Sequence, residues 1–147
     1  METIYEIQRI KQVVSEIKVD KRFIRSPEDA ADIAREFIGD EDREVFLVAC
    51  LNTKNAVVAV HRAHVGSLNA SICHPREIFK AAILNNAASI ICFHNHPSGS
   101  TIQSPEDVEV TKRLYAAGNM IGIEMFDHII IGGNNSSYIS MREKGYF

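Results

Sequence analysis

Cysteine is scarce in this sequence of 147 residues, which contains only Cys50, Cys73 and Cys92. An odd number of widely spaced cysteines argues against a disulfide framework, and without a Cys-x-x-Cys pair there is no zinc ribbon. Each cysteine lies in or near an apolar run, where a thiol packs like a small apolar side chain. We therefore expect all three to be reduced residues that fill the core.

Positive charge is also scarce. The chain has 16 Lys and Arg residues against 19 Asp and Glu residues, which gives a net charge of −3. This balance provides no general attraction to phosphate backbones or to anionic lipid, so we expect no direct binding of nucleic acid. Lys18, Lys21, Arg22 and Arg25 form one local basic run, which we interpret as a solvated surface, with contact to an acidic partner as the alternative.

The sequence lacks repeats, low-complexity tracts and a recognisable linker between domains. Charged residues interrupt the apolar positions of Met1–Ile10, which argues against a signal peptide or a membrane span there and predicts a cytoplasmic protein. With 46% hydrophobic residues, a chain of 147 residues suits one domain that buries a core. We predict a single domain over residues 1–147, with its core in residues 26–147.

Residues 1–25 would then form an N-terminal extension or an edge strand. Ile4, Ile7, Ile10 and Val14 recur at a spacing typical of a helix, whereas the content of Ile and Val in this segment favours a strand. We favour an edge strand over residues 4–19.

Hydrophobic patterning predicts alternating strands and helices in the rest of the chain. Residues 44–51 form a near-continuous apolar run, which is typical of a strand buried on both faces. Apolar residues at helical spacing predict helices, with Gly39 and Gly118 as C-caps. In chain order we expect helix 27–38, strands 44–51 and 56–61, helix 76–87, strand 89–93, helix 106–117, and strands 121–131 and 137–140. This order predicts an α/β fold, in which helices flank a mixed β-sheet.

The residues with the clearest chemistry lie in one short segment. His94 and His96 are two positions apart near the end of a predicted strand, so their imidazoles would point to the same side. Ser104 and Pro105 predict a helix start, and Asp107 in the first turn is placed to complete a group of three ligands. Two imidazoles and a carboxylate with one open position are typical of a catalytic zinc site, because structural sites usually have four protein ligands.

Each half of this pattern has a simpler interpretation when it is taken alone. An isolated His-x-His pair is usually structural, and Ser104–Asp107 is a good helix start with carboxylates in the first turn. Ser26–Asp29 has the same sequence, Ser-Pro-Glu-Asp, without histidines before it, and we interpret that copy only as a helix start. The complete spacing from His94 to Asp107 is what favours a metal site.

His94, His96, Ser104 and Asp107 match the signature of the JAMM (MPN-plus) metalloproteases, and the chain resembles that family. Residues 93–99, Phe-His-Asn-His-Pro-Ser-Gly, resemble its bacterial RadC branch in particular. The resemblance implies the three-layer fold of the family, which is similar to that of cytidine deaminases.

The resemblance continues through residues 74–80 and 127–132, and it covers roughly residues 26–147. Ser100 and Gln103 depart from it, because RadC-like sequences often have Asp and Pro at these positions. Both lie between the ligands, so they bear on the shape of the loop more than on metal binding. Longer members begin with a helix-hairpin-helix module, for which we expect no room in this chain.

Glu44 is the candidate general base. It lies at the start of the first buried strand, where partial loss of water would make its carboxylate a better proton acceptor. The simpler interpretation is a polar residue that opens a strand. Because the JAMM family carries its catalytic Glu on such a strand upstream of the histidine pair, the resemblance implies this role for Glu44, with Glu41 as the nearest competitor.

The resemblance also implies a reaction. His94, His96 and Asp107 would hold Zn²⁺, which lowers the pKa of a bound water, and Glu44 would accept the proton of that water. The Ser104 hydroxyl would help to stabilise the oxyanion and would also cap its helix. The expected reaction is hydrolysis of a peptide or isopeptide bond in a protein or peptide substrate.

Other functions fit the sequence less well. A nucleobase deaminase would need a His-x-Glu pair and a Pro-Cys-x-x-Cys motif, and both are missing. A metal-binding module without turnover and a DNA-repair factor are the alternatives, although the acidic balance argues against DNA contact. His61, His64 and His74 have no partner at ligand spacing, and we expect His128 to be a core histidine rather than a second group near the zinc.

Overall fold

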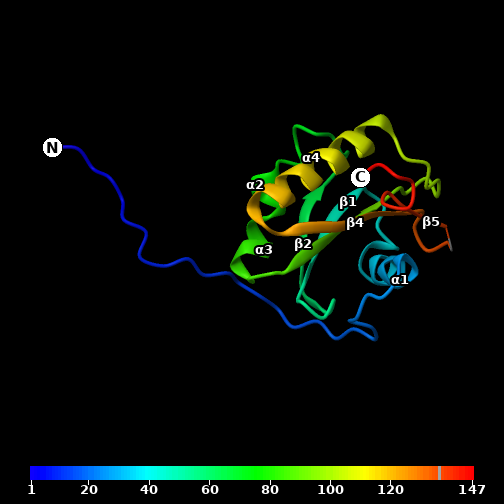
Figure 1. Ribbon diagram of the computed structural model, residues 1–147, viewed down its shortest axis with the longest axis horizontal. Helices are drawn as coiled ribbons and strands as arrows, with labels where there is room; N and C mark the ends of the chain where they lie inside the picture. Colours follow the sequence, from blue (N-terminus) through cyan, green and yellow to red (C-terminus); the bar gives the residue numbers. More distant parts are fainter. Residues whose placement is uncertain (136) are drawn as a thin grey trace.

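The computed structural model describes residues 1–135 and 137–147. Its centre is a five-stranded sheet with the strand order β2-β1-β3-β4-β5, and helices cover both faces of this sheet (Figure 1). In chain order the elements are α1 (Pro27–Ile38), β1 (Val45–Leu51), β2 (Val57–Val65), α2 (Pro75–Ile78), α3 (Lys80–Leu84), β3 (Ser89–Asn95), α4 (Pro105–Ile121), β4 (Glu124–Ile131) and β5 (Tyr138–Ser140). The predicted α/β fold with a mixed sheet is confirmed.

The central position in the sheet belongs to β3. It pairs antiparallel with β1 and parallel with β4, while β2 and β5 pair antiparallel on the two outer sides. Every residue of β1 and β3 is buried, which explains why β1 is a continuous apolar run and why the middle of β3, Ile90–Phe93, is one as well. The parallel pair requires a long crossover, and α4 provides it.

Two apolar clusters hold the three layers together, because alternate residues of each strand point to opposite faces of the sheet. On one face, α1 packs on Leu47, Phe93 and Ile129. On the other face, α2, α3 and α4 pack on Phe46 and Cys92. Figure 1 shows α1 on one side of the sheet and the other helices on the opposite side. The three cysteines are buried and free, as the sequence indicated.

The two Ser-Pro-Glu-Asp segments both begin helices. Ser26 caps α1 by accepting a hydrogen bond from the backbone N–H of Asp29, and Ser104 caps α4 in the same way from Asp107, each over 3.1 Å. These side chains satisfy backbone donors that the first turn of a helix leaves without a partner. Among the described helices, none is both long enough and apolar enough to cross a bilayer.

The predicted end of α4 at Gly118 is wrong. The helix continues to Ile121 and ends at Gly122, which has the left-handed φ of 79° that glycine adopts without strain. Gly118 instead marks a close approach between α4 and the start of β4, because a Cβ at this position would lie 2.5 Å from the carbonyl oxygen of Ile123. Two differences are smaller: residues 76–87 form two short helices, and β2 extends to Val65.

The predicted edge strand over residues 4–19 is wrong as well. Residues 1–19 have neither helix nor strand, and Figure 1 shows the first of them running away from the rest of the protein as an extended tail. A strand needs a neighbour for its backbone hydrogen bonds, and residues 1–19 make none with β2, the strand at this edge of the sheet. Only Phe23, further along, makes a β-bridge, and its partner is Ala56.

We expect Gly118→Ala to destabilise the protein by about 1–3 kcal/mol, because the added methyl group meets backbone atoms that it cannot displace without moving β4. Helix propensity alone would make Gly118→Ala stabilising by roughly 1 kcal/mol, so the expected effect on stability has the opposite sign. Chemical denaturation measures the effect. Asn119→Ala, at the next and exposed position of α4, is the matched control and should be neutral or stabilising; a stabilised Gly118→Ala would contradict the close approach.

Candidate metal centre

His94 lies near the end of the central strand and is almost completely buried, with 1% of its surface exposed. Its side chain is on the face covered by α4, since Phe46 is its cross-strand neighbour on β1. Neither ring nitrogen of His94 has a hydrogen-bond partner among the described residues. Burial lowers the pKa of His94, although the carboxylate of Asp107 opposes this effect, so the ring is neutral and offers a free lone pair.

His96 directly follows the last residue of β3. It extends the pairing of β3 with β4, because its backbone N–H donates to the carbonyl of Ile131 over 2.9 Å. Its Nδ1 lies 2.8 Å from the carbonyl oxygen of Ser100. A carbonyl only accepts, so Nδ1 carries the proton and Nε2 is directed elsewhere. That arrangement, in which a backbone carbonyl fixes the tautomer of an imidazole, is common for histidines that bind metals.

Asp107 connects the two histidines. Its Oδ1 lies 3.3 Å from Nδ1 of His94, and its Oδ2 lies 3.3 Å from Nε2 of His96. Oδ2 also accepts the backbone N–H of Ser104 over 2.8 Å, which completes a capping box at the start of α4. Burial acts to raise the pKa of Asp107, but the hydrogen bonds from His96 and from the Ser104 backbone outweigh it and lower the pKa to about 2. Asp107 is therefore a carboxylate.

Glu44 approaches the histidines from the opposite side. It directly precedes β1, and its Oε1 lies 3.5 Å from Nε2 of His94, while its Oε2 accepts the backbone N–H of Leu68 over 3.2 Å. Its side chain keeps 29% of its surface exposed, so water reaches it. Glu41 is held elsewhere, because it pairs with Arg62 over 2.9 Å and Arg62 also donates to the carbonyl of Phe37. The structure thus brings Glu44, and not Glu41, to the histidine pair.

Asn95 was not among the residues that the sequence singled out, although it lies between the two histidines. Its side chain points away from them and is fully buried. Its Oδ1 accepts the N–H of Val45 over 2.7 Å, and its Nδ2 donates to the carbonyl of Arg43 over 3.0 Å. Arg43 and Val45 are the two neighbours of Glu44, so the Asn95 amide holds the backbone on both sides of Glu44. The sequence could have identified Asn95 by its position, because it is a polar residue between two histidines next to a strand that was predicted to be buried.

His128 lies beside this group, in the adjacent strand. It is completely buried, and its ring centroid is 6.1 Å from that of His94. The Thr111 hydroxyl donates to the carbonyl of Asp107 over 2.7 Å, so at 2.6 Å from Nδ1 of His128 it accepts the proton of that nitrogen. Burial lowers the pKa of His128 to about 3, and the ring is neutral. His128, which the sequence predicted to be a core histidine, thus also contacts Thr111, whose hydroxyl binds the backbone carbonyl of Asp107.

These residues fit a divalent metal ion. One ligand atom from each of Glu44, His94 and His96 lies within 4.8 Å of the others, and Asp107 contacts both histidines. A buried imidazole with no hydrogen bond at either nitrogen, a second imidazole and two carboxylates are a donor set that suits zinc and related metals. A metal ion would also replace the proton that the hydrogen bond with Asp107 favours on His96, whose pKa is raised by that contact.

The fold and this group of residues define an α/β domain with a candidate metal site at the junction of a central strand and the following helix. Residues 24–146 match the family described as RadC-like JAB domain, and the chain belongs to that family. The resemblance drawn from the His-x-His motif is thereby confirmed.

Similar proteins occur in several bacteria. The UPF0758 protein ABC2615 of Shouchella clausii is 48% identical over 137 residues, which cover 93% of this chain and 59% of the relative. The UPF0758 protein YsxA of Bacillus subtilis is 51% identical over 123 residues, or 84% of this chain and 52% of the relative. A relative in Caldanaerobacter subterraneus is 52% identical over 124 residues. This chain therefore spans a little over half the length of the curated relatives it matches.

We expect Thr111→Val to destabilise the protein by about 1–3 kcal/mol, because it keeps the shape of the side chain but leaves Nδ1–H of His128 buried without an acceptor. Thermal or chemical unfolding of the metal-free protein measures this change. Thr53→Val, at an exposed position of the turn between β1 and β2, is the control and should change the stability by less than about 0.5 kcal/mol. Equal stability of Thr111→Val and the unmodified protein would contradict the assigned tautomer.

Proposed function

We propose that this protein is a zinc-dependent hydrolase that cleaves a peptide or isopeptide bond in a protein or peptide substrate. The observation that carries the proposal is the position of two carboxylates on two sides of His94. Asp107 contacts both histidines from the first turn of α4, and Glu44 approaches from the start of β1. One carboxylate is therefore available as a ligand and the other as a base, which is the division of roles that metal-assisted hydrolysis requires.

His94, His96 and Asp107 are the residues that would hold the ion. All three present nitrogen or oxygen donors, and two of them are almost completely buried. Zinc with three protein ligands and one open position lowers the pKa of a bound water towards neutrality and polarises a substrate carbonyl. The assignment of Asp107 rather than Glu44 as the third ligand rests on its contact with both imidazoles and on its low pKa.

Glu44 would move the proton. Its carboxylate is partly exposed, Oε2 accepts the backbone N–H of Leu68, and Oε1 faces His94, where it would accept a proton from the attacking water. The same carboxyl group would then donate that proton to the amine that leaves. The Asn95 amide assists by fixing the backbone on both sides of Glu44.

Ser104 would donate to the oxyanion that forms at the substrate carbonyl. Its Oγ already accepts the N–H of Asp107, and this uses a lone pair but not the hydroxyl proton. The hydroxyl can therefore cap α4 and donate a hydrogen bond at the same time. We also propose that the protein acts in the cytoplasm, where its three free thiols would stay reduced.

The first test concerns the ligands. We expect the purified protein to hold about one zinc per chain, and we expect His94→Ala, His96→Ala and Asp107→Asn to lose it. Glu44→Gln should retain zinc, since it removes the proton acceptor without removing a ligand. Elemental analysis after dialysis against a weak chelator gives the stoichiometry. Full retention by either histidine variant would refute the ligand set, and loss of zinc from Glu44→Gln would make Glu44 a ligand.

The second test concerns the base. Glu44→Gln in the zinc-loaded protein should lower turnover of a peptide- or isopeptide-linked substrate by about a hundredfold to ten-thousandfold, because a positioned base is lost. Glu41→Gln is the matched control, and it should leave turnover nearly unchanged because Glu41 pairs with Arg62. Ser104→Ala should cost less turnover and about 1 kcal/mol of stability.

The outcomes of the second test separate three interpretations. Equal turnover by the unmodified protein and Glu44→Gln would exclude Glu44 as the base. A selective loss in Glu41→Gln would assign the base three residues upstream. If the zinc-loaded protein cleaves none of the substrates, the site is a metal-binding module without turnover.

A further inference from the structure

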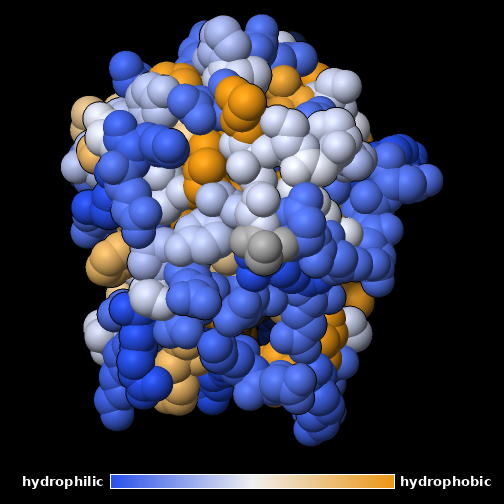
Figure 2. All heavy atoms as spheres, turned by 90° about the vertical axis from the view of Figure 1, so that its right-hand side faces the viewer, coloured by the Kyte–Doolittle hydropathy of each residue, from blue (hydrophilic) through white to orange (hydrophobic). Residues whose placement is uncertain are grey.

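The N-terminal arm, residues 4–19, exposes apolar side chains that the rest of the protein does not cover. Ile4 and Val14 are 91% and 76% exposed. Among the described residues, nine of the nineteen exposed large apolar residues belong to residues 1–19: Met1, Ile4, Tyr5, Ile7, Ile10, Val13, Val14, Ile17 and Val19. By contrast, the face that Figure 2 shows is mostly hydrophilic, with only small apolar patches. A concentration of exposed apolar residues of this kind marks a contact surface.

A trough lies between the second half of this arm and the body of the domain. Residues 12–21 form one wall, and Val57–His61 of β2 form the other, with Phe37 of α1 and Leu84 of α3 beside them. The cavity has a volume of about 790 Å³. Its apolar rim includes Val58 and Leu84, which are 45% and 38% exposed.

The β2 wall of the trough is the edge strand of the sheet. Within the part of the chain that the structure describes, its outer side pairs with backbone only at its beginning, where Val57 N–H donates to the carbonyl of Arg22 and Phe23 bridges to Ala56. An edge strand of this kind presents backbone donors and acceptors that can pair with another extended segment. The trough also contains a buried polar atom, Nδ1 of His61, which has no hydrogen-bond partner among the described residues.

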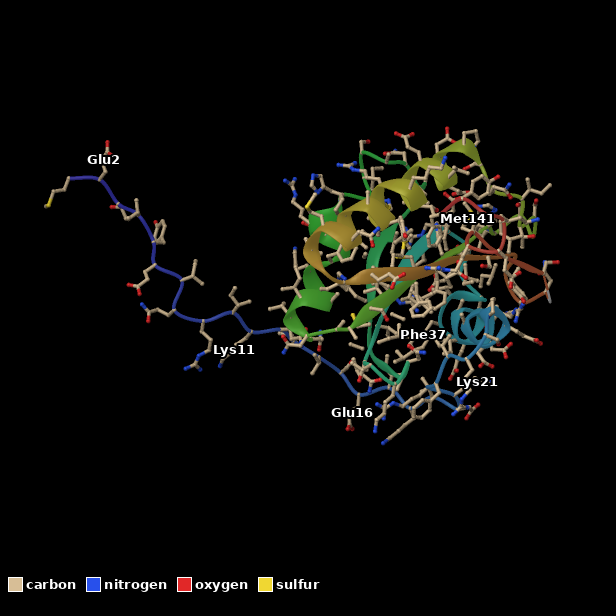
Figure 3. All side chains as sticks on the ribbon, viewed as in Figure 1. Glu2, Lys11, Glu16, Lys21, Phe37 and Met141 are labelled. Atoms are coloured by element: carbon tan, nitrogen blue, oxygen red, sulfur yellow. The ribbon has the colours of Figure 1, made fainter. Side chains whose placement is uncertain are left out.

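The first half of the arm cannot easily enter the trough of its own chain. Gln12 is fixed to the body by two hydrogen bonds with Asn85, of 3.0 and 3.1 Å. Before Gln12 the chain leads away, and Figure 3 shows Glu2 and Lys11 on the part that projects from the domain. To return, the arm would have to reverse direction within a segment, residues 1–19, that contains no Gly, Pro, Asn or Asp. Tight turns depend on these residues.

We propose that residues 4–10 of one copy of this chain occupy the trough of a second copy, so that two copies exchange their arms. Seven extended residues span about 23 Å, which fits within the roughly 30 Å of a nine-residue strand such as β2. The arm supplies the apolar side chains and the unpaired backbone, and the trough supplies the edge strand and the apolar rim. Because each copy carries both parts, the exchange closes as a two-fold symmetric dimer.

The mass of the full chain in solution tests the dimer. Sedimentation equilibrium at micromolar concentration should give twice the monomer mass of 16.4 kDa. Ile4→Ser, Ile7→Ser and Ile10→Ser combined should return the mass to that of one chain while the circular dichroism spectrum stays unchanged, since these residues are exposed in the single copy. The matched control combines Ile102→Ser and Met120→Ser, which change exposed apolar residues elsewhere, and should remain dimeric.

A cross-link between chains tests the position of the arm. Ile7→Cys and Val58→Cys are placed in separate chains, which are mixed, refolded together and oxidised, and the linked peptide is identified by mass spectrometry. A disulfide between the two different chains is the expected product. A monomeric full chain, a dimer that survives the triple substitution, or a cross-link that forms only when both cysteines are in one chain would each overturn the exchange.

Discussion

The contact of Asp107 with both histidines is the interaction on which the site depends. One carboxylate joins the end of the central strand to the first turn of the longest helix, and it does so while it caps that helix. The helix start and the site therefore stabilise each other. The positive end of the α4 dipole favours a carboxylate at this position, and the two imidazoles keep that carboxylate oriented. A residue that only capped the helix would not need to be buried as Asp107 is.

The order of the strands explains why the site is buried at His94 and exposed to water at Glu44. Since β3 lies between β1 and β4, His94 has neighbours on both sides and α4 above it, and its ring is neutral. Glu44 precedes the first residue of β1, so it lies at the edge of the same layer and remains in contact with water. A buried neutral imidazole, His94, next to a partly exposed carboxylate, Glu44, follows from which strand is central and where its neighbour begins.

The spacing of residues predicted the parts of the site that depend on local structure. His94 and His96 share a face because β3 continues to Asn95. The position of Asp107 follows from the helix start that Ser104–Asp107 define. The copy at Ser26–Asp29 forms the same cap, yet its aspartate accepts the backbone N–H of Arg25 and pairs with Lys21. Identical local sequence thus produces the same helix start, and only the neighbouring strand, with its two histidines, makes one copy part of the candidate metal site.

Contacts between distant segments could not be predicted in the same way. The role of Asn95 depends on the register between β1 and β3, and the length of α4 depends on how closely Gly118 approaches β4. The prediction of a strand in residues 4–19 was wrong because apolar composition does not show whether a neighbouring strand pairs with a segment, and the chain meets β2 only from Arg22 and Phe23 onward among the described residues. Likewise, the choice between Glu44 and Glu41 needed a resemblance, since only the fold shows that Arg62 engages Glu41.

The bridge that Asn95 makes to Arg43 and Val45 has a consequence for how the protein folds. It joins two segments about fifty residues apart in the chain, so Glu44 cannot approach His94 until the loop between them has closed and the two strands have paired. Closing such a loop costs chain entropy before any contact compensates for it, and contacts of this separation form late in folding. A chain with only its helices formed would hold no ion. Metal binding at the proposed site would therefore report that folding is complete, and by mass action it would stabilise the folded sheet.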